Sequence, residues 1–185
     1  MAEFLSQKFK SKSGSEVTIR SATKEDAIGV LDLSSRVMAE EIYMLTTSSE
    51  FKMSLEAEER WIESHLSKPN DLILLAEMDT QIVGMLDFSN GRRERIAHTG
   101  EFGMSIAKEF REMGVGTLLM TALIQWASEN PTIEKIGLQV HSNNKRAIGL
   151  YRKMGFEVEG IRKRDLKYGK DQYIDTMVMG LILKE

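Results

Sequence analysis

The chain has 185 residues, of which 42% are hydrophobic and 29% charged, and its formal net charge at pH 7 is −3. This composition suits one globular domain with a substantial core and gives no general attraction to nucleic acid. The lack of cysteine excludes disulfides, thiolate metal sites and a cysteine acyl-enzyme. No apolar run is long enough to span a bilayer, and residues 1–15 lack the apolar segment of a secretory signal. We therefore expect a cytoplasmic protein with neither nucleic-acid nor membrane partners.

In chain order, the spacing of apolar residues predicts a single α/β domain. The first elements are a strand and two helices, over residues 16–20, 23–37 and 55–66. A hairpin and a third strand follow, over residues 72–77, 82–88 and 98–106. The last elements are a helix, a strand, a second helix and two strands, over residues 116–129, 133–140, 143–154, 156–162 and 173–183. We expect residues 1–15 to form a tail or an extra strand, and residues 16–185 to form the domain.

The first predicted helix has a recognisable start and an apolar face. Thr23 precedes Asp26 by three residues, as in a capping box. The apolar face of this helix is predicted to consist of Ile28, Leu31, Leu33 and Val37. Residues 24–63 contain ten Asp or Glu against four Lys or Arg. We interpret this excess as two solvated helix faces; the alternative is an acidic lip that attracts cationic amines.

Residues 111–117 read Arg-Glu-Met-Gly-Val-Gly-Thr and join an apolar strand to a helix. The two glycines let the main chain approach a ligand closely, and the first amides of the helix are unpaired donors. This arrangement favours a diphosphate. A P-loop requires a lysine where Gly116 stands, and a dinucleotide fingerprint requires a third small residue where Leu119 stands. Both nucleotide interpretations are therefore weak.

Two motifs together resemble those of the GNAT family of N-acetyltransferases. Arg111, Gly114 and Gly116 match its Arg/Gln-x-x-Gly-x-Gly/Ala acyl-CoA loop. Residues 144–156, Asn-Lys-Arg-Ala-Ile-Gly-Leu-Tyr-Arg-Lys-Met-Gly-Phe, are similar to its second signature, Asn-x-x-Ala-x-x-Leu-Tyr-x-x-x-Gly-Phe. The resemblance covers nearly all of residues 16–183. In its motifs it is strongest to the spermidine/spermine and ribosomal-protein-alanine acetyltransferase branch.

The resemblance implies both a fold and an activity. The fold would be a mixed, mostly antiparallel central sheet flanked by helices, with two splayed strands forming the acyl-CoA cleft. The activity would be direct transfer of an acetyl group from acetyl-CoA to a primary amine in a ternary complex, without a metal. A polyamine, a protein N-terminus, an amino acid and an amine antibiotic all remain open as acceptors, and a homodimer remains open. The alternative class is a non-catalytic acyl-CoA-binding sensor or scaffold.

The resemblance also implies two catalytic residues. Tyr151 stands at the position of the general acid, and a phenol with a pKa near 10 is protonated at neutral pH; the alternative is that Tyr151 only packs. Glu101 is a candidate base, acting directly or through water; the alternative is an exposed carboxylate at a strand end. Gln139, on the facing strand, stands where some ribosomal-protein acetyltransferases carry Glu, and it cannot take a proton.

The predicted cofactor-binding residues come from the same strands, loop and helix. They are Met104, Ser105, Ile106, Arg111, Glu112, Met113, Gly114, Val115, Gly116, Thr117, Asn144, Ala147 and Tyr151. Asn144 would contact the pantetheine or cap its helix. Lys145, Arg146 and Lys153 would either touch the 3′-phosphate of CoA or form a solvated face.

Overall fold

The computed structural model describes residues 4–40 and 42–184. Its strands are β1 (Gln7–Lys10), β2 (Glu16–Ser21), β3 (Leu72–Met78), β4 (Gln81–Asn90), β5 (Thr99–Ile106), β6 (Lys135–His141), β7 (Glu157–Gly169) and β8 (Gln172–Ile182). Its α-helices are α1 (Ala27–Met38), α2 (Leu55–Leu66), α3 (Val115–Glu129) and α4 (Lys145–Lys153). Short 3₁₀ turns cover Lys24–Asp26, Glu94–Ile96 and Lys108–Phe110. None of the described helices is long and apolar enough to cross a bilayer.

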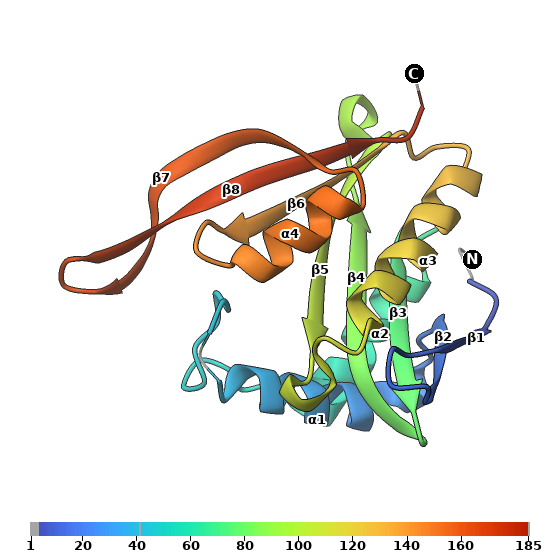
Figure 1. Ribbon diagram of the computed structural model, residues 1–185. Coiled ribbons are helices and arrows are strands. Elements are labelled where there is room, and N and C mark those ends of the chain that lie inside the picture. The colour runs from blue at the N-terminus through green and yellow to red at the C-terminus, as the bar shows by residue number, and fades with distance from the viewer. Residues whose placement is uncertain (1–3, 41, 185) are drawn as a thin grey trace.

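The eight strands form one sheet in the order β1-β2-β3-β4-β5-β6-β8-β7. Every neighbouring pair is antiparallel except β5 and β6, which run parallel. Figure 1 shows α3 and α4 in front of the strands and α2 behind them. The prediction of one domain with a mixed, mostly antiparallel sheet flanked by helices is confirmed.

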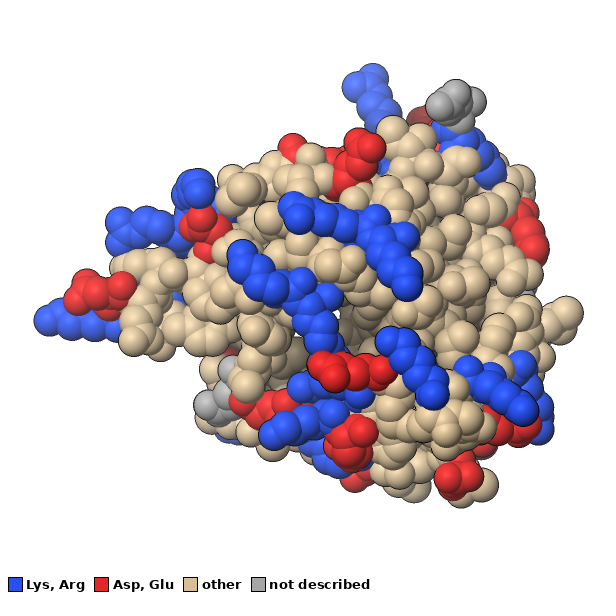
Figure 2. Space-filling view, in the orientation of Figure 1, with Lys and Arg blue, Asp and Glu red and all other residues tan. Residues whose placement is uncertain are grey.

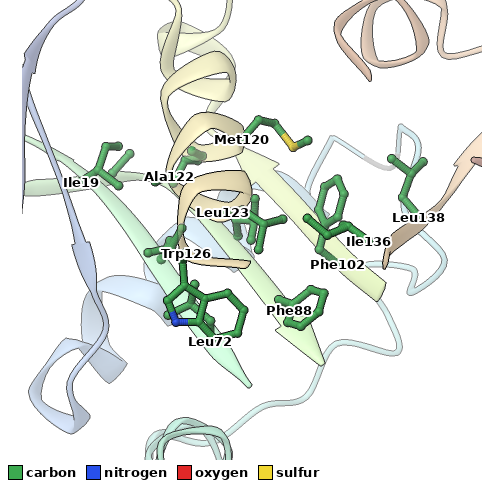
Figure 3. Close-up of a cluster of buried hydrophobic side chains, with 14 of the residues drawn as sticks. Ile19, Leu72, Phe88, Phe102, Met120, Ala122, Leu123, Trp126, Ile136 and Leu138 are labelled. Atoms are coloured by element: carbon green, nitrogen blue, oxygen red, sulfur yellow. The ribbon is translucent and has the colours of Figure 1, made fainter. Parts of the chain in front are cut away.

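Each face of the sheet has its own apolar core. Side chains of α3 pack on the central strands, where the rings of Trp126 and Phe88 lie 5.5 Å apart, edge to face (Figure 3). A smaller core lies under α1 and α2. Because successive strand residues point to opposite faces, β4 contributes Leu86 and Phe88 to the first core and Ile82 and Met85 to the second. This alternation decides which residues reach each side of the site.

The buried face of the first helix only partly overlaps the predicted one: Leu33 and Val37 are buried as predicted, whereas Ile28 and Leu31 are not. A 3₁₀ turn precedes α1, and the buried residues of α1 are Ala27, Val30, Leu33 and Val37. Ile28 is 69% exposed. Gly29 lies against Ile82, whose Cδ1 would be 2.7 Å from a Cβ at that position. The start of the helix therefore approaches the sheet through the small residue Gly29, and the predicted face was wrong at Ile28 and Leu31 but correct at Leu33 and Val37.

Two segments extend beyond the predicted elements. Residues of β1 pair with β2 from Gln7↔Ile19 to Lys10↔Glu16, so an extra strand precedes the domain; residues 1–3 lie outside the described part. The hairpin of β7 and β8 is much longer than predicted, because pairing continues to Gly169↔Gln172. Figure 1 shows this hairpin as an arm that projects past the rest of the sheet.

Candidate functional site

The parallel strands β5 and β6 separate after a short contact. Their pairing is limited to Thr99↔Lys135, Gly100↔Ile136 and Glu101↔Gly137. Beyond these pairs, β5 continues along β4 as far as Ile106, while β6 continues along β8 as far as His141. The two strands are therefore splayed, as the resemblance implies.

A cavity of about 540 Å³ lies in the gap between the splayed strands. From the strands and α4 it is lined by Met85, Asp87, Phe102, Gly103, Met104, Ser105, Gln139, Val140, His141, Asn144 and Tyr151. From α1, the loop after it and the arm it is lined by Ser34, Val37, Met38, Tyr43, Met44, Leu45, Thr46, Arg162, Asp165, Leu166 and Thr176. Its lining thus comes from both faces of the sheet. Figure 2 shows a hollow in the face that bears α3 and α4, with Lys and Arg side chains along its rim.

The loop before α3 presents main-chain donors. Glu112 and Gly114 have positive φ angles of 69° and 93°, and the first helical hydrogen bond runs from the Leu118 N–H to the Gly114 carbonyl. The N–H groups of residues 115–117 have no main-chain acceptor within the described part of the chain. Because such groups at a helix start favour an anion, residues 112–117 fit a diphosphate.

Glycine is required at the two positions of this loop for different physical reasons. Gly114 adopts a left-handed conformation that a residue with a Cβ rarely takes. At Gly116 a Cβ would lie 3.1 Å from both Ile106 Cδ1 and Leu150 Cδ2. Gly116 therefore lets α3 pack closely on β5 and α4. A side chain at this position would press on Ile106 and Leu150 and would not block the amides of the loop.

The Arg111 side chain does not point into the loop. Its guanidinium makes a bidentate ion pair with Glu40, at 2.6 and 2.7 Å, and its Nε donates to the Ile106 carbonyl at 2.9 Å. Arg111 therefore ties the loop to the end of α1 and to β5. Its contribution to an anion site can come only from its main chain.

Tyr151 lies on α4 with its side chain buried against the end of the gap. Its ring packs edge to face on Phe102, with ring centres 5.7 Å apart, and it also contacts Phe156. Burial raises the pKa of Tyr151 to about 12. No hydrogen bond to its hydroxyl occurs among residues 4–40 and 42–184, and the residue lines the cavity. The phenol is thus protonated at any physiological pH and its proton is available.

Asp87 is a cavity residue that the sequence analysis missed. It lies on β4 opposite Gly103 of β5, and an ideal Cβ on Gly103 would be 3.1 Å from Asp87 Oδ1. Burial raises the pKa of Asp87, an effect partly offset by the charge of His65 and by its own main-chain N–H. No ion pair reaches Asp87 within the described residues. A lone acid inside the apolar run 82–88 was the signal that could have revealed it.

Glu101 and Gln139 meet on the same face of the sheet as Asp87. The Gln139 amide donates to Glu101 at 3.0 Å, and Arg162 of the arm donates to Gln139 at 2.8 Å. Gln139 and Arg162 line the cavity, whereas Glu101 is exposed beside it. Glu101 pairs with Ser89, two residue pairs along the β4–β5 ladder from the Asp87↔Gly103 pair, so its side chain lies on the same face as that of Asp87.

Asn144 and His141 close the end of the gap near α4. The Asn144 side chain accepts from the Ala147 N–H at 3.1 Å, so it caps α4 while lining the cavity; Ala147 itself packs in the core. His141 shares a hydrogen bond of 3.1 Å with the Tyr168 hydroxyl, and burial lowers the pKa of His141. The imidazole is therefore neutral near pH 7.

The acidic residues of the stretch 24–63 do not line the cavity within the described part of the chain; Glu41 lies outside it. Several of them are held in ion pairs with Lys or Arg, namely Asp26, Asp32, Glu40, Glu59 and Glu63. This favours the interpretation as solvated helix faces. Among the described residues, no group of three or more His, Cys, Asp or Glu is placed to hold a metal ion.

Comparison with known proteins gives a consistent result. The sequence model described as the acetyltransferase (GNAT) family matches residues 37–156. The L-amino acid N-acetyltransferase AaaT of Escherichia coli (strain K12) is 28% identical over 91% of this chain and 99% of its own length. An L-methionine sulfoximine/L-methionine sulfone acetyltransferase of Pseudomonas aeruginosa is 24% identical over 90% of this chain and 94% of its own.

Solved structures share the fold over nearly the whole chain. A GNAT-family acetyltransferase from Streptococcus pneumoniae has a TM-score of 0.85 at 28% identity, covering 90% of this chain and 99% of its own. The protein yncA of Salmonella typhimurium, solved with its cofactor acetyl-CoA, has a TM-score of 0.81 at 20% identity, covering 91% and 95%. The family model, the splayed strands and the amide-lined loop agree: this chain belongs to the GNAT family and is an N-acetyltransferase.

Proposed function

We propose that this enzyme transfers the acetyl group of acetyl-CoA to the α-amino group of a free amino acid. The observation that carries the proposal is the cavity between β5 and β6, which the Tyr151 phenol enters from one face of the sheet and the Asp87 carboxylate from the other. The names of AaaT and of the methionine sulfoximine acetyltransferase support a free amino acid as the acceptor.

The cofactor would bind on the face that bears α3 and α4. The amides of residues 112–117 would hold the diphosphate, and the main chain of residues 104–106 would lie along the pantetheine arm. Asn144 would orient the end of α4 beside this arm, with Ala147 packed behind it. Main-chain N–H groups of β5 in the gap would donate to the thioester oxygen as it becomes negative.

Tyr151 is assigned the role of general acid. When the neutral amine nitrogen bonds to the thioester carbon, the C–S bond breaks and the sulfur leaves as a thiolate, and the nitrogen, which is now cationic, loses its second proton to solvent to give the amide. Tyr151, whose pKa is raised to about 12, is fully protonated and can donate to this sulfur. The phenolate that results regains its proton from solvent through the cavity.

The two carboxylates are assigned different roles. Asp87 lines the cavity and lacks an ionic partner among the described residues, so it would bind the ammonium group of the acceptor. Glu101 lies on the same face and is exposed to solvent, so it remains the proposed base, removing a proton through water. The amine is neutral once this proton has left, as attack on the thioester requires.

Arg162 and the apolar lining favour a free amino acid. Arg162 lines the cavity, and within the described residues its guanidinium makes one hydrogen bond, to neutral Gln139. It therefore keeps donors for a carboxylate. Met38, Met44 and Met85 give the same cavity a flexible apolar wall, which suits an apolar side chain.

A panel of acceptors tests the proposal. L-methionine and L-phenylalanine would be compared with their amides, with spermidine and with a short peptide, using release of the CoA thiol as the readout. We expect kcat/KM for the free amino acids to exceed that for their amides by about tenfold or more, since one charged hydrogen bond is worth about 1.5–3 kcal/mol. Arg162→Gln should remove most of this preference.

Other outcomes would assign the site differently. Preference for spermidine or for the peptide would support a polyamine or protein N-terminus, as in the branch indicated by the sequence motifs. Binding of acetyl-CoA without thiol release across the whole panel would support the sensor or scaffold. In both cases the amino-acid acceptor would be wrong.

A further inference from the structure

The N-terminal hairpin touches the diphosphate loop. Its turn, residues 11–15, connects β1 to β2, and the Lys12 N–H donates to the Met113 carbonyl at 2.9 Å. The Lys12 Cγ lies 3.6 Å from the position that a Cβ would take on Gly114. Hydrogen bonds from Ser11 to Ser15 within the turn hold it in shape. The Lys12 side chain therefore passes directly over the start of α3.

The side chains of the loop supply no free positive charge to a diphosphate bound at its amides. Between residues 111 and 117, Arg111 is the one cation, and its guanidinium is bound to Glu40. Glu112, which is exposed on the same loop, adds a negative charge. The helix amides are neutral donors and supply only partial positive charge. A full positive charge beside the phosphates must therefore come from another part of the chain.

Lys12 meets this need. It is exposed, and no ion pair or hydrogen bond to its ammonium occurs within residues 4–40 and 42–184. A lysine stem reaches several ångströms beyond Cγ, which suffices to bring the charge from Gly114 to a phosphate bound at the helix amides. Lys12 lies outside residues 37–156, the part of the chain that the family model matches.

From this contact and this charge balance we infer that Lys12 is a cofactor-binding residue, whose ammonium group pairs with the diphosphate of acetyl-CoA. The inference rests on the acetyl-CoA site of the proposed function and is independent of the acceptor. The hairpin that precedes the domain is then part of the cofactor site. Because its contact with Met113 is made by the main chain, a change of the Lys12 side chain leaves that contact in place.

Calorimetric titration of CoA and of 3′-dephospho-CoA into the wild type and into Lys12→Ala, Lys12→Arg and Lys10→Ala tests the inference. Lys10 is an exposed cation on the same hairpin and is the matched control. We expect Lys12→Ala to weaken both ligands by about three- to fivefold, the upper part of the range of an exposed ion pair. Lys12→Arg should retain most of the affinity, and Lys10→Ala should stay within twofold, as a rough allowance for long-range charge. The Kd of Lys12→Ala should also depend less on salt than that of the wild type.

Three results would overturn the inference. The first is an unchanged Kd for Lys12→Ala, and the second is an equal loss in Lys10→Ala, which would indicate only a general field. The third is a loss that disappears with 3′-dephospho-CoA, which would place Lys12 at the 3′-phosphate. Absence of any CoA binding by the wild type would instead reject the acetyl-CoA site itself. Equal Tm values of the ligand-free variants would show that the fold is intact.

Discussion

Tyr151 combines a buried ring with a hydroxyl that has no hydrogen bond in the described part of the chain, and the two groups can be tested separately. Tyr151→Phe deletes the proton donor and keeps the ring that packs on Phe102. We expect kcat to fall by about 10²-fold or more, while the Kd of acetyl-CoA changes less than about threefold. Single-turnover kinetics with the preferred amine measure the chemical step without product release. An unaltered rate would mean that Tyr151 only packs.

The same residue predicts how stability changes at high pH. The pKa of Tyr151 is about 12 in the folded protein against an ordinary value of 10.0, so the folded state holds this proton more tightly. Its contribution is complete below pH 10 and is lost as the pH rises to about 12. Two pKa units correspond to about 2.7 kcal/mol. In denaturant titrations between pH 9 and 12, Tyr151→Phe should therefore lose less stability than the wild type; parallel losses would contradict this.

Asp87 should lower the stability of the fold while contributing to acceptor binding. Burial raises its pKa above the ordinary 3.8, so its contribution to stability is present below that value and is lost as the pH rises through the folded pKa. At a pH above the folded pKa of Asp87, the wild type therefore carries the cost of a buried charge. Asp87→Asn should raise the free energy of unfolding by about 0.5–2 kcal/mol, measured by urea denaturation at pH 7.

The expected kinetic effects separate the two carboxylates. Asp87→Asn should raise the acceptor KM by about tenfold and leave the Kd of acetyl-CoA unchanged, because it removes one charged hydrogen bond to the ammonium. Glu101→Gln should instead lower kcat/KM mainly at low pH, where little free amine exists without a base. Identical pH profiles for the two variants would contradict separate roles.

Among the elements, the loop before α3 makes a prediction that distinguishes its glycines. Gly114→Val forces a β-branched residue to a φ of 93°, and this should abolish acetyl-CoA binding by deforming the loop. Gly116→Val should mainly lower stability, by about 1–3 kcal/mol, because its side chain would press on Ile106 and Leu150. Isothermal titration and chemical denaturation of both variants give the two quantities. Equal stability loss with retained binding in both would remove the loop from the site.

Elements defined by contiguous motifs were predictable from the sequence, and those defined by tertiary packing were not. The strand, loop and helix around residues 111–117 follow from glycine spacing and apolar runs. The buried face of α1 does not, because Gly29 is small enough to approach Ile82 while Ile28 is left exposed. The arm was underestimated because its strand β7 is exposed on both sides and shows no apolar alternation.

The site was predictable to the same extent. Tyr151, Asn144 and the loop residues belong to local motifs, and the structure places Tyr151 and Asn144 in the cavity. Asp87 and Arg162 reach the cavity only through long-range placement: one through its register opposite Gly103, the other through the length of the arm. The proposed role of Lys12 could not be predicted from the sequence, because it depends on the contact between the N-terminal hairpin and Met113, which no local pattern indicates.

For the molecule as a whole, acetyl-CoA should act as a stabilising ligand. A ligand that binds only the native state adds RT ln(1 + [L]/Kd), about 2.7 kcal/mol at a hundredfold excess over Kd. For a domain of this size that corresponds to a rise in Tm of about 5–10 °C. Differential scanning fluorimetry with acetyl-CoA and with ATP as the control measures it. A shift with ATP and none with acetyl-CoA would contradict the cofactor assignment.

The separation of β5 from β6 has a consequence for how the protein would recognise its cofactor. Past the last pair, Glu101↔Gly137, each strand offers ladder positions that no neighbouring strand occupies. The pantetheine arm carries two amide groups along an extended chain, so it can occupy the gap as a surrogate strand. Main-chain peptide groups, and not side chains, would then recognise the arm. Conservative changes at Met104 or Ser105 would leave the affinity for acetyl-CoA almost unchanged. Proline, which removes a main-chain donor, would be the informative substitution.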